Sequence, residues 1–308
     1  MKISIIGAGK VGASAAFCIL ERGLADELCL VDVDANKARG VAIDLSHGVS
    51  EQGRAATVMG GGDYSIAQGS DIYIITAGSH RMPGQSRLDL TKTNAGVVRE
   101  VMVEISGWEN NGESSGLIVG PKILVVTNPV DVMTYVAVKT DFFPERLVFG
   151  LGTVLDSIRF KTGICTKTGA NPETVEAMIV GEHGDSMVPL LSLTRIDGKP
   201  VSELDVDVDG ILEEVRTSAD EIVKYKGGTC YAPAVAIANV VEAVVRDEKR
   251  ILPVSTFHED YGVCVSLPVQ VGSGGFKRVM KTRLSGKEKE RFEESLDVIR
   301  KACAETGL

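Results

Sequence analysis

The sequence has few features that would point to a metal site, a disulfide framework or a membrane segment. Its six cysteines are scattered without a Cys-x-x-Cys pair, and none of the four histidines stands at metal-ligand spacing. Such usage is typical of reduced thiols, so we expect a cytosolic protein without a bound metal. No run approaches about 18 uninterrupted apolar residues, which argues against a membrane span. Lys10 and three glycines interrupt the apolar N-terminal run, which argues against a signal peptide.

Basic charge is also scarce. The 308 residues carry a formal net charge of −9. A nucleic acid and an anionic membrane surface both require a basic face, so we expect neither as a partner. An apolar content of 44% and a charged content of 24% are ordinary for a globular protein. The chain is long enough for one large or two modest domains, and no repeat or low-complexity linker divides it.

The first half of the chain alternates strands with helices. Strands are expected at 2–6, 27–33, 71–76 and 122–127, and helices at 11–22, 35–46 and 89–106. The bounded apolar runs DIYIIT and KILVVT are typical of strands that are buried on both faces. This alternation predicts an α/β fold with a doubly wound parallel sheet of Rossmann type over residues 1–142.

The alternation loosens near residue 142, and residues 143–308 are expected to form a second, α+β domain that binds the substrate. Strands are expected at 175–181, 251–256 and 262–271, and helices at 154–162, 212–225 and 234–246. The chain closes with an amphipathic helix, for which Ser285 is the expected N-cap. Phe292, Leu296 and Ile299 repeat there at helical spacing.

A glycine-rich turn follows the first expected strand and opens the first expected helix. Its residues are Gly7, Ala8, Gly9, Lys10, Val11 and Gly12. Glycines let the backbone approach a pyrophosphate, and a helix N-terminus supplies oriented N–H groups. Asp32 ends the second strand, at the spacing where a carboxylate meets the adenosine ribose. These features predict a dinucleotide site that favours NAD, because a carboxylate repels the 2′-phosphate of NADP, although Lys37 leaves NADP possible.

His183, in the turn GEHGD, is the candidate proton carrier. Hydride transfer at a C–O carbon needs a proton donor at the oxygen, and the imidazole pKa lies near neutrality. Asp156 could hold the imidazole tautomer, and Asp156 and Arg159 share one helix face at i, i+3. Each residue alone has another interpretation: His183 could cap a helix, and Asp156 with Arg159 could form a surface salt bridge. Arg81 and Arg87 add fixed positive charge suited to an anionic substrate.

Seven motifs, in order and over nearly the whole chain, resemble the lactate/malate dehydrogenase family. They are GAGKVG at 7–12, LVDVD at 30–34, AGSHRMPGQSR at 77–87, VTNPVD at 126–131, LDSIR at 155–159, GEHGDS at 181–186 and KGGT at 226–229. The resemblance implies His183 as the acid/base, Asp156 as its partner and Arg159 as a clamp on the substrate carboxylate. It also implies that Arg87 polarises the reacting carbonyl from a mobile loop. The remaining implied contacts are Asn128 and Thr229 with the substrate, and Asn94, Val126 and Asn128 with the cofactor.

The choice of substrate depends on Arg81. An arginine in this Arg-x-Pro-Gly context resembles malate dehydrogenases, whereas lactate dehydrogenases carry a glutamine. Oxaloacetate brings a second carboxylate that would be costly to enclose unpaired, and pyruvate would leave Arg81 itself buried and unpaired. We therefore expect NAD-dependent interconversion of malate and oxaloacetate, a small dicarboxylate pair.

Two other functions and the state of assembly stay open on the sequence. A dehydrogenase of another 2-hydroxy acid such as lactate is the first alternative, and a non-catalytic NAD-binding redox sensor is the second. The resemblance implies a homo-oligomer, a tetramer rather than a dimer. Residues 108–120 are longer than the connection expected from the family, and they are interpreted as a surface loop or an oligomer contact.

Overall fold

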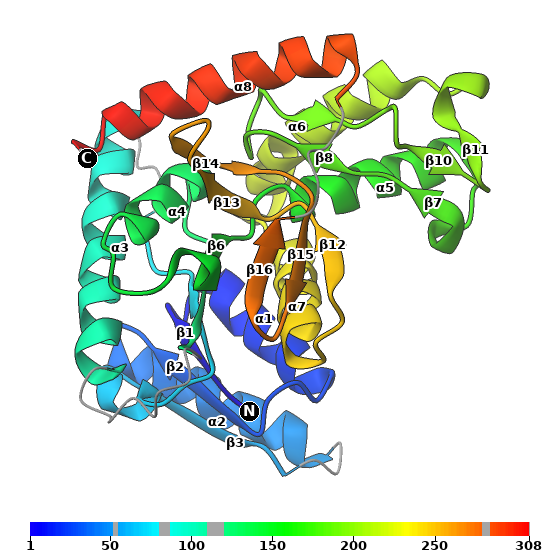
Figure 1. Cartoon of the computed structure of the whole chain (residues 1–308). Helices are drawn as coiled ribbons and strands as arrows, with labels where there is room; N and C mark the ends of the chain where they lie inside the picture. Colours follow the sequence, from blue (N-terminus) through cyan, green and yellow to red (C-terminus); the bar gives the residue numbers. More distant parts are fainter. Residues whose placement is uncertain (52–54, 80–86, 110–119, 279–283, 308) are drawn as a thin grey trace.

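One eight-stranded sheet organises the chain, in a computed structural model that describes residues 1–51, 55–79, 87–109, 120–278 and 284–307. Six neighbouring strands are parallel: β3 (Thr57–Gly61), β2 (Glu27–Val31), β1 (Lys2–Ile6), β4 (Ile72–Ile75), β5 (Lys122–Val125) and β6 (Val148–Gly150). Two antiparallel strands, β13 (Ser255–His258) and β14 (Val263–Ser266), extend the sheet beyond β6. The order reverses between β1 and β4, so the predicted doubly wound sheet is confirmed (Figure 1).

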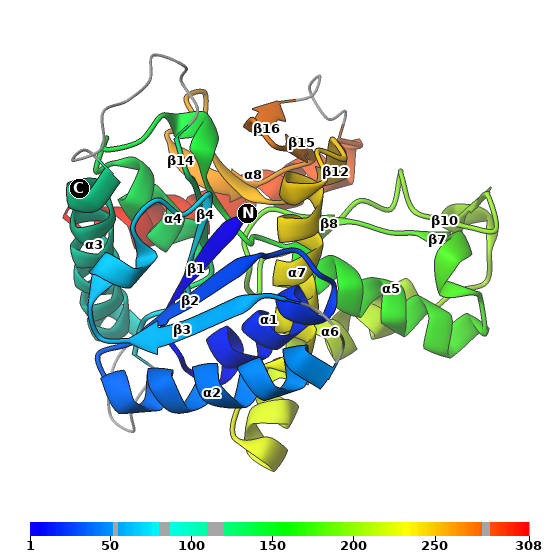
Figure 2. The same cartoon turned by 90° about the horizontal axis from the view of Figure 1, so that it is seen from below.

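Helices cover both faces of this sheet. One face packs against α1 (Lys10–Glu21), α2 (Ala35–Glu51) and α7 (Tyr231–Val245), and the other against α3 (Arg87–Glu109), α4 (Val130–Val138) and α8 (Gly286–Ala304). Figure 2 shows α1 and α2 below strands β1 to β3. Alternation along β4 explains why both faces are apolar. Ile72 and Ile74 join one buried cluster, whereas Tyr73 and Ile75 join the other.

The second half adds smaller sheets around two further helices. The helices are α5 (Val154–Thr168) and α6 (Val208–Lys226). Three-stranded sheets consist of β7 (Val175–Glu176), β10 (Arg195–Ile196) and β11 (Lys199–Pro200), and of β12 (Arg250–Leu252), β15 (Val269–Gly272) and β16 (Gly275–Arg278). A two-stranded sheet pairs β8 (Ile179–Val180) with β9 (Val188–Pro189). The predicted α+β character of this half is therefore confirmed.

Three predicted strands are each divided in two. The strand expected at 251–256 is split between β12 and β13 around Pro253, and the strand expected at 262–271 is split between β14 and β15 around Pro268. Proline lacks the N–H that a ladder needs, so each chain segment leaves one sheet there and enters another. The strand expected at 175–181 is divided because β7 pairs with β10, whereas β8 pairs with β9.

Some elements are longer than expected or were not expected at all. Helix α2 continues to Glu51, α3 to Glu109 and α5 to Thr168, and β3 and β16 had no counterpart among the predicted strands. The expected loop at 108–120 lies mostly outside the described residues, since only 108, 109 and 120 are described. Strand β6 follows the predicted domain boundary at residue 142 and still pairs with β5. No helix among the described residues is long and apolar enough to cross a membrane.

The closing helix begins at the predicted N-cap, Ser285. The Glu288 carboxylate accepts a hydrogen bond from the backbone N–H of Ser285 at 2.6 Å, which forms part of a capping box. The same carboxylate accepts hydrogen bonds from the backbone N–H and the hydroxyl of Ser192, both at 2.9 Å. Glu288 is only 5% exposed, so a single buried carboxylate connects the start of α8 to the segment that follows β9.

Removing this carboxylate should destabilise the fold. In Glu288→Ala, the N–H groups of Ser192 and Ser285 lose a buried acceptor, and we expect the free energy of unfolding to fall by about 1–3 kcal/mol. Urea unfolding followed by circular dichroism measures this loss. Glu290→Ala is the matched control, because Glu290 is exposed on the same helix, and it should change stability by less than about 0.5 kcal/mol. Equal losses in both variants would contradict the role assigned to Glu288.

Candidate active site

The carboxyl ends of β1, β2, β4 and β5 lie at the same edge of the sheet and are followed by most of the predicted cofactor residues. Ligands of doubly wound sheets bind at this edge, near the point where the strand order reverses. The glycine-rich turn after β1 faces the loop after β4, because a Cβ on Gly7 would lie 2.7 Å from the backbone nitrogen of Ala77. The predicted residues are thus brought together by the parallel strands.

The three glycines of the turn meet different requirements. Gly7 has a φ of +110°, a backbone conformation that side chains disfavour. A Cβ on Gly12 would lie 2.0 Å from the carbonyl oxygen of Gly7, so only glycine lets α1 pack this closely on the turn. Gly9 precedes the first residue of α1, and a Cβ there would meet nothing within 4 Å. The N-terminus of α1 is therefore open at Gly9, as a phosphate-binding turn requires.

Asp32 is held at the end of β2 by the backbone. Its carboxylate accepts hydrogen bonds from the N–H of Ala8 at 2.7 Å and of Asp34 at 3.0 Å. The ammonium of Lys37 lies 3.7 Å from the carboxylate, and the Asp32 side chain remains 12% exposed. Lys37, which had left NADP possible, thus neutralises part of the charge of Asp32. A ribose would meet a carboxylate that the glycine-rich turn itself orients.

Asn94 connects the loops after β4 and β5. Its amide donates to the carbonyl of Asn128 at 2.8 Å and to the carbonyl of Ser79 at 3.3 Å, and its oxygen accepts from the N–H of Ser79 at 2.8 Å. The side chain is buried, so these bonds join two loops that are distant in sequence. Val126 continues the ladder by donating its N–H to Ile75. Asn94 therefore fixes the loop that carries Asn128 relative to the loop that carries Ser79.

The three candidates from the second half of the chain, His183, Asp156 and Arg159, contact one another. His183 lies in the turn after β8, and its Nδ1 is 2.5 Å from a carboxylate oxygen of Asp156 in the first turn of α5. The second oxygen of Asp156 lies 3.3 Å from the guanidinium of Arg159. The Asp156 side chain is 1% exposed and that of Arg159 is 14% exposed, so the alternative of a surface salt bridge is wrong.

Residues before and after Asp156 in the sequence form hydrogen bonds to β8. The hydroxyl of Thr153 donates to the carbonyl of Ile179 at 2.6 Å, and the hydroxyl of Ser157 accepts from the N–H of Ile179 at 2.9 Å. Both backbone groups of Ile179 are thus hydrogen-bonded by the N-cap and the first turn of α5. This pairing fixes the distance between Asp156 and the turn that carries His183.

The electrostatic environment favours a protonated His183. Burial by itself lowers its pKa, but the attraction and the hydrogen bond of Asp156, with a smaller contribution from the charge of Asp131, raise it above its usual value. Arg159 opposes the shift weakly. The His183 side chain is 20% exposed, so part of the imidazole is open to a bound molecule.

The remaining predicted residues are only partly described. Arg81 lies outside the described residues, and Arg87 is the first residue of α3, with a side chain that is not described. Thr229 follows Gly227 and Gly228 between α6 and α7. The ammonium of Lys10 lies 3.3 Å from the carbonyl of Gly227, so the glycine-rich turn contacts the segment that carries Thr229.

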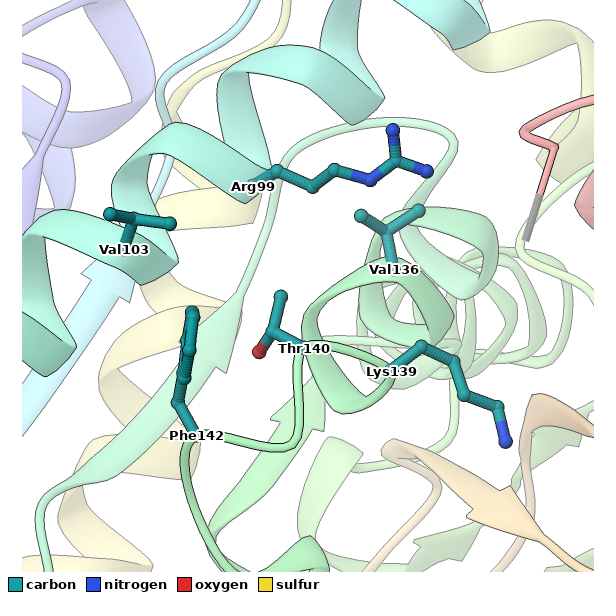
Figure 3. A pocket seen from close by; sticks show the side chains of 6 residues that line it. All are labelled: Arg99, Val103, Val136, Lys139, Thr140 and Phe142. Atoms are coloured by element: carbon teal, nitrogen blue, oxygen red, sulfur yellow. The ribbon is translucent and has the colours of Figure 1, made fainter.

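A separate pocket of about 250 Å³ lies between α3 and α4 and contains none of the predicted site residues. It is lined by Arg99, Val103, Val136, Lys139, Thr140 and Phe142. In Figure 3 the charged ends of Arg99 and Lys139 extend away from Val103 and Phe142. Among the described residues, no group of three or more His, Cys, Asp or Glu could hold a metal ion.

Comparisons with known proteins agree with this geometry. The model of the lactate/malate dehydrogenase NAD-binding domain matches residues 1–150, and that of the family's α/β C-terminal domain matches residues 153–306. The chain belongs to the lactate/malate dehydrogenase family. It therefore contains an NAD-binding domain, as predicted, and the family is one of oxidoreductases that act on small carboxylates.

Similar members of the lactate/malate dehydrogenase family carry both names. The malate dehydrogenase of Chlorobium chlorochromatii is 38% identical over 98% of this chain and 97% of its own length. The L-lactate dehydrogenase of Kosmotoga olearia is 36% identical over 98% and 95%. The solved structure of Archaeoglobus fulgidus malate dehydrogenase in complex with NADH is 39% identical, has a TM-score of 0.90 and covers 100% of both chains. The substrate of this family member therefore has to be argued from its own residues.

Asp131, a residue of the lactate/malate dehydrogenase motifs, had no predicted role, although it contacts the turn that carries His183. Asp131 ends the motif VTNPVD, and its carboxylate accepts a hydrogen bond from the backbone N–H of His183 at 2.8 Å. A signal was present in the sequence, because Asp131 is the only charged residue in the apolar helix α4. Its partner lies 52 positions later, so no local pattern could reveal the contact.

Replacing Asp32 tests the cofactor site. Asp32→Ser removes the carboxylate that a ribose would bind, and we expect NADH to bind about 10- to 100-fold more weakly. The preference for NADH over NADPH should narrow, because Lys37 is then free of its anionic partner. Fluorescence titration with both cofactors measures the change. Asp34→Asn is the control, since it removes a neighbouring charge, and an Asp32 variant with the cofactor preference of that control would contradict the assignment.

Proposed function

We propose that this chain is an NAD-dependent malate dehydrogenase that interconverts malate and oxaloacetate. The contact between His183 and Asp156, with Arg159 on the same carboxylate, supports the reaction class. The observation that carries malate over lactate is Arg81 in the sequence RMPG. A fixed guanidinium at this position supplies the partner that the second carboxylate of oxaloacetate needs in a closed site.

The proposed cofactor site consists of the glycine-rich turn and the residues around it. Backbone N–H groups near Gly9 would hold the pyrophosphate, Asp32 would bind the ribose, and Asn94, Val126 and Asn128 would line the nicotinamide side. When bound, the reduced cofactor supplies a hydride to the carbonyl carbon of the substrate. The open N-terminus of α1 and the exposed part of Asp32 fit such a ligand.

His183 supplies the proton that balances the hydride. In the reduction, protonated His183 would donate from Nε2 to the carbonyl oxygen while Asp156 holds the Nδ1–H and so fixes the ring. The C=O bond becomes CH–OH, and His183 is left neutral. In the oxidation, neutral His183 accepts the hydroxyl proton, and Asp156 stabilises the imidazolium that forms.

The arginines would hold and polarise the substrate. Arg159 presents a fixed fork that matches the carboxylate next to the reacting carbon, and its contact with Asp156 orients it. Arg87, the first residue of α3, would polarise the carbonyl, and Arg81 would bind the distal carboxylate. Thr229 would face the substrate from the segment after α6.

We further propose a cytosolic homotetramer. All six cysteines are free thiols, which supports a reducing compartment. Large apolar side chains are exposed on neighbouring helices, with Phe17 on α1, Ile43 on α2 and Tyr231 on α7. Such a surface supports self-association. Light scattering coupled to size exclusion measures the number of subunits.

His183→Asn tests the proton carrier. This variant should bind NADH as the unchanged protein does, but kcat should fall by about 10²–10⁴-fold. In the unchanged protein, oxaloacetate reduction should fall as the pH rises through the raised pKa of His183, because only the protonated imidazole donates. His47→Asn, on the exposed surface of α2, is the control and should keep the activity. Near-full turnover in His183→Asn would remove His183 from the mechanism.

Arg81→Gln tests the substrate. Loss of a charge-assisted contact in a desolvated site costs about 2–5 kcal/mol, so kcat/KM for oxaloacetate should fall roughly 30- to several-thousand-fold. Pyruvate reduction should improve, because no unpaired guanidinium is enclosed. Lys92→Gln removes an exposed charge from α3 and should leave the ratio of the two substrates unchanged. If Arg81→Gln also leaves that ratio unchanged, malate loses its main support and lactate becomes the better candidate.

A further inference from the structure

Asp131 is a buried carboxylate at the junction of the two domains. It lies in the first turn of α4 and is 3% exposed. One of its oxygens accepts from the N–H of His183 at 2.8 Å, and the other accepts from the hydroxyls of Ser255 at 2.6 Å and Ser266 at 3.5 Å. The carboxylate therefore connects α4, β13, β14 and the turn that carries His183.

Three successive N–H groups of that turn are held by three different elements. The N–H of Gly181 donates to the carbonyl of Ser266 in β14 at 2.9 Å, and that of Glu182 donates to the hydroxyl of Ser295 in α8 at 2.7 Å. The N–H of His183 donates to Asp131. Of these three acceptors only Asp131 is ionisable. Its contact alone can therefore both position the backbone of His183 and place a negative charge near the imidazole.

The charged and titratable groups near Asp131 lie in the turn, in β14, in α8 and in α5, whereas β13 contributes the hydroxyl of Ser255. They are His183 and Glu182 in the turn, Cys264 in β14 and Cys303 in α8, with Asp156 and Arg159 of α5 on the far side of His183. Burial raises the pKa of Asp131 to about 6, against the hydrogen bonds from Ser255 and His183 and the attraction to His183. Asp131 is therefore about half ionised near pH 6, and the ionised form predominates at neutral pH.

We propose that Asp131 is a positioning residue of the proton transfer, which holds the backbone of His183 and adds a second negative charge to that of Asp156. The proposal rests on the proposed role of His183 as acid/base. A carboxylate is costly to bury unless a nearby group is stabilised by its charge. The charge is useful at this place because His183 is a cation before it donates its proton.

Asp131→Asn separates charge from shape. The amide oxygen can still accept from the N–H of His183, but the negative charge is gone. We expect the pKa of His183 to fall, as measured by NMR of the ¹⁵N-labelled imidazole in the protein without substrate. Oxaloacetate reduction should fall as the pH rises, and this decline, the pH limb, should move to lower pH in the variant. If the pKa of His183 is lower by one, about tenfold less activity should remain at high pH. The affinity for NADH and the melting temperature should not fall.

Three further variants separate the effect of position from the effect of charge. Ser295→Ala removes the neighbouring backbone contact without removing a charge, so it should leave the pKa of His183 and the pH limb in place, whatever it does to kcat. Asp131→Ala removes both charge and contact and should lower kcat by about 100-fold, since displacement of a catalytic group by about 1 Å has effects of that size. Asp131→Glu should restore the charge and move the pH limb back towards its original place.

The outcomes distinguish this proposal from the proposed function. If Asp131→Asn leaves both the NMR pKa of His183 and the pH limb unchanged, while His183→Asn is inactive, then Asp131 has no electrostatic role and the dehydrogenase assignment stands. If His183→Asn is active, the role of His183 itself fails. A lower melting temperature in Asp131→Asn with an unmoved pH limb would mark Asp131 as a purely structural residue and overturn the proposal.

Discussion

The site depends on one buried carboxylate that two cationic groups share. Asp156 is almost fully buried, and it is tolerated because one oxygen meets the imidazole of His183 and the other meets the guanidinium of Arg159. Without both partners the charge would be uncompensated in the interior. Asp156 orients the imidazole, raises its pKa and orients the guanidinium. One carboxylate thus positions both groups that would act on a substrate.

The contact between Asp156 and His183 depends in turn on how the two halves of the chain pack against each other. Helix α5 follows directly after β6, so it starts at the edge of the sheet where the cofactor residues lie. Thr153 and Ser157 bind both backbone groups of Ile179, and Asp131 binds the N–H of His183 from the other side. The turn that carries His183 is thereby held between the NAD-binding domain and the C-terminal domain. The proposed hydride and proton sites would thus be positioned by contacts that also join the two halves of the chain.

Much of the fold could be predicted, because apolar periodicity and turn chemistry are local properties. The alternation of strands and helices, the glycine-rich turn after β1 and the Ser285 cap all follow from neighbouring residues. The predicted strands were wrong where the extent of a strand depends on which other strand it pairs with. Apolar runs across Pro253 and Pro268 looked continuous, yet each half pairs in a different sheet. The five residues of β3 carried too weak a pattern, and their strand is defined by parallel pairing with β2.

The sequence by itself determined which chemical groups are available: a phosphate-binding turn, an acidic strand end, a histidine and the arginines that suit an anionic substrate. These follow from residue types and short spacings, which act through local backbone geometry. Only the tertiary structure decided that Asp156 meets the imidazole 27 positions later and that Asp131 meets the backbone of the same histidine from 52 positions away. Such contacts depend on how separate elements pack, and packing is decided by the whole core rather than by any one segment.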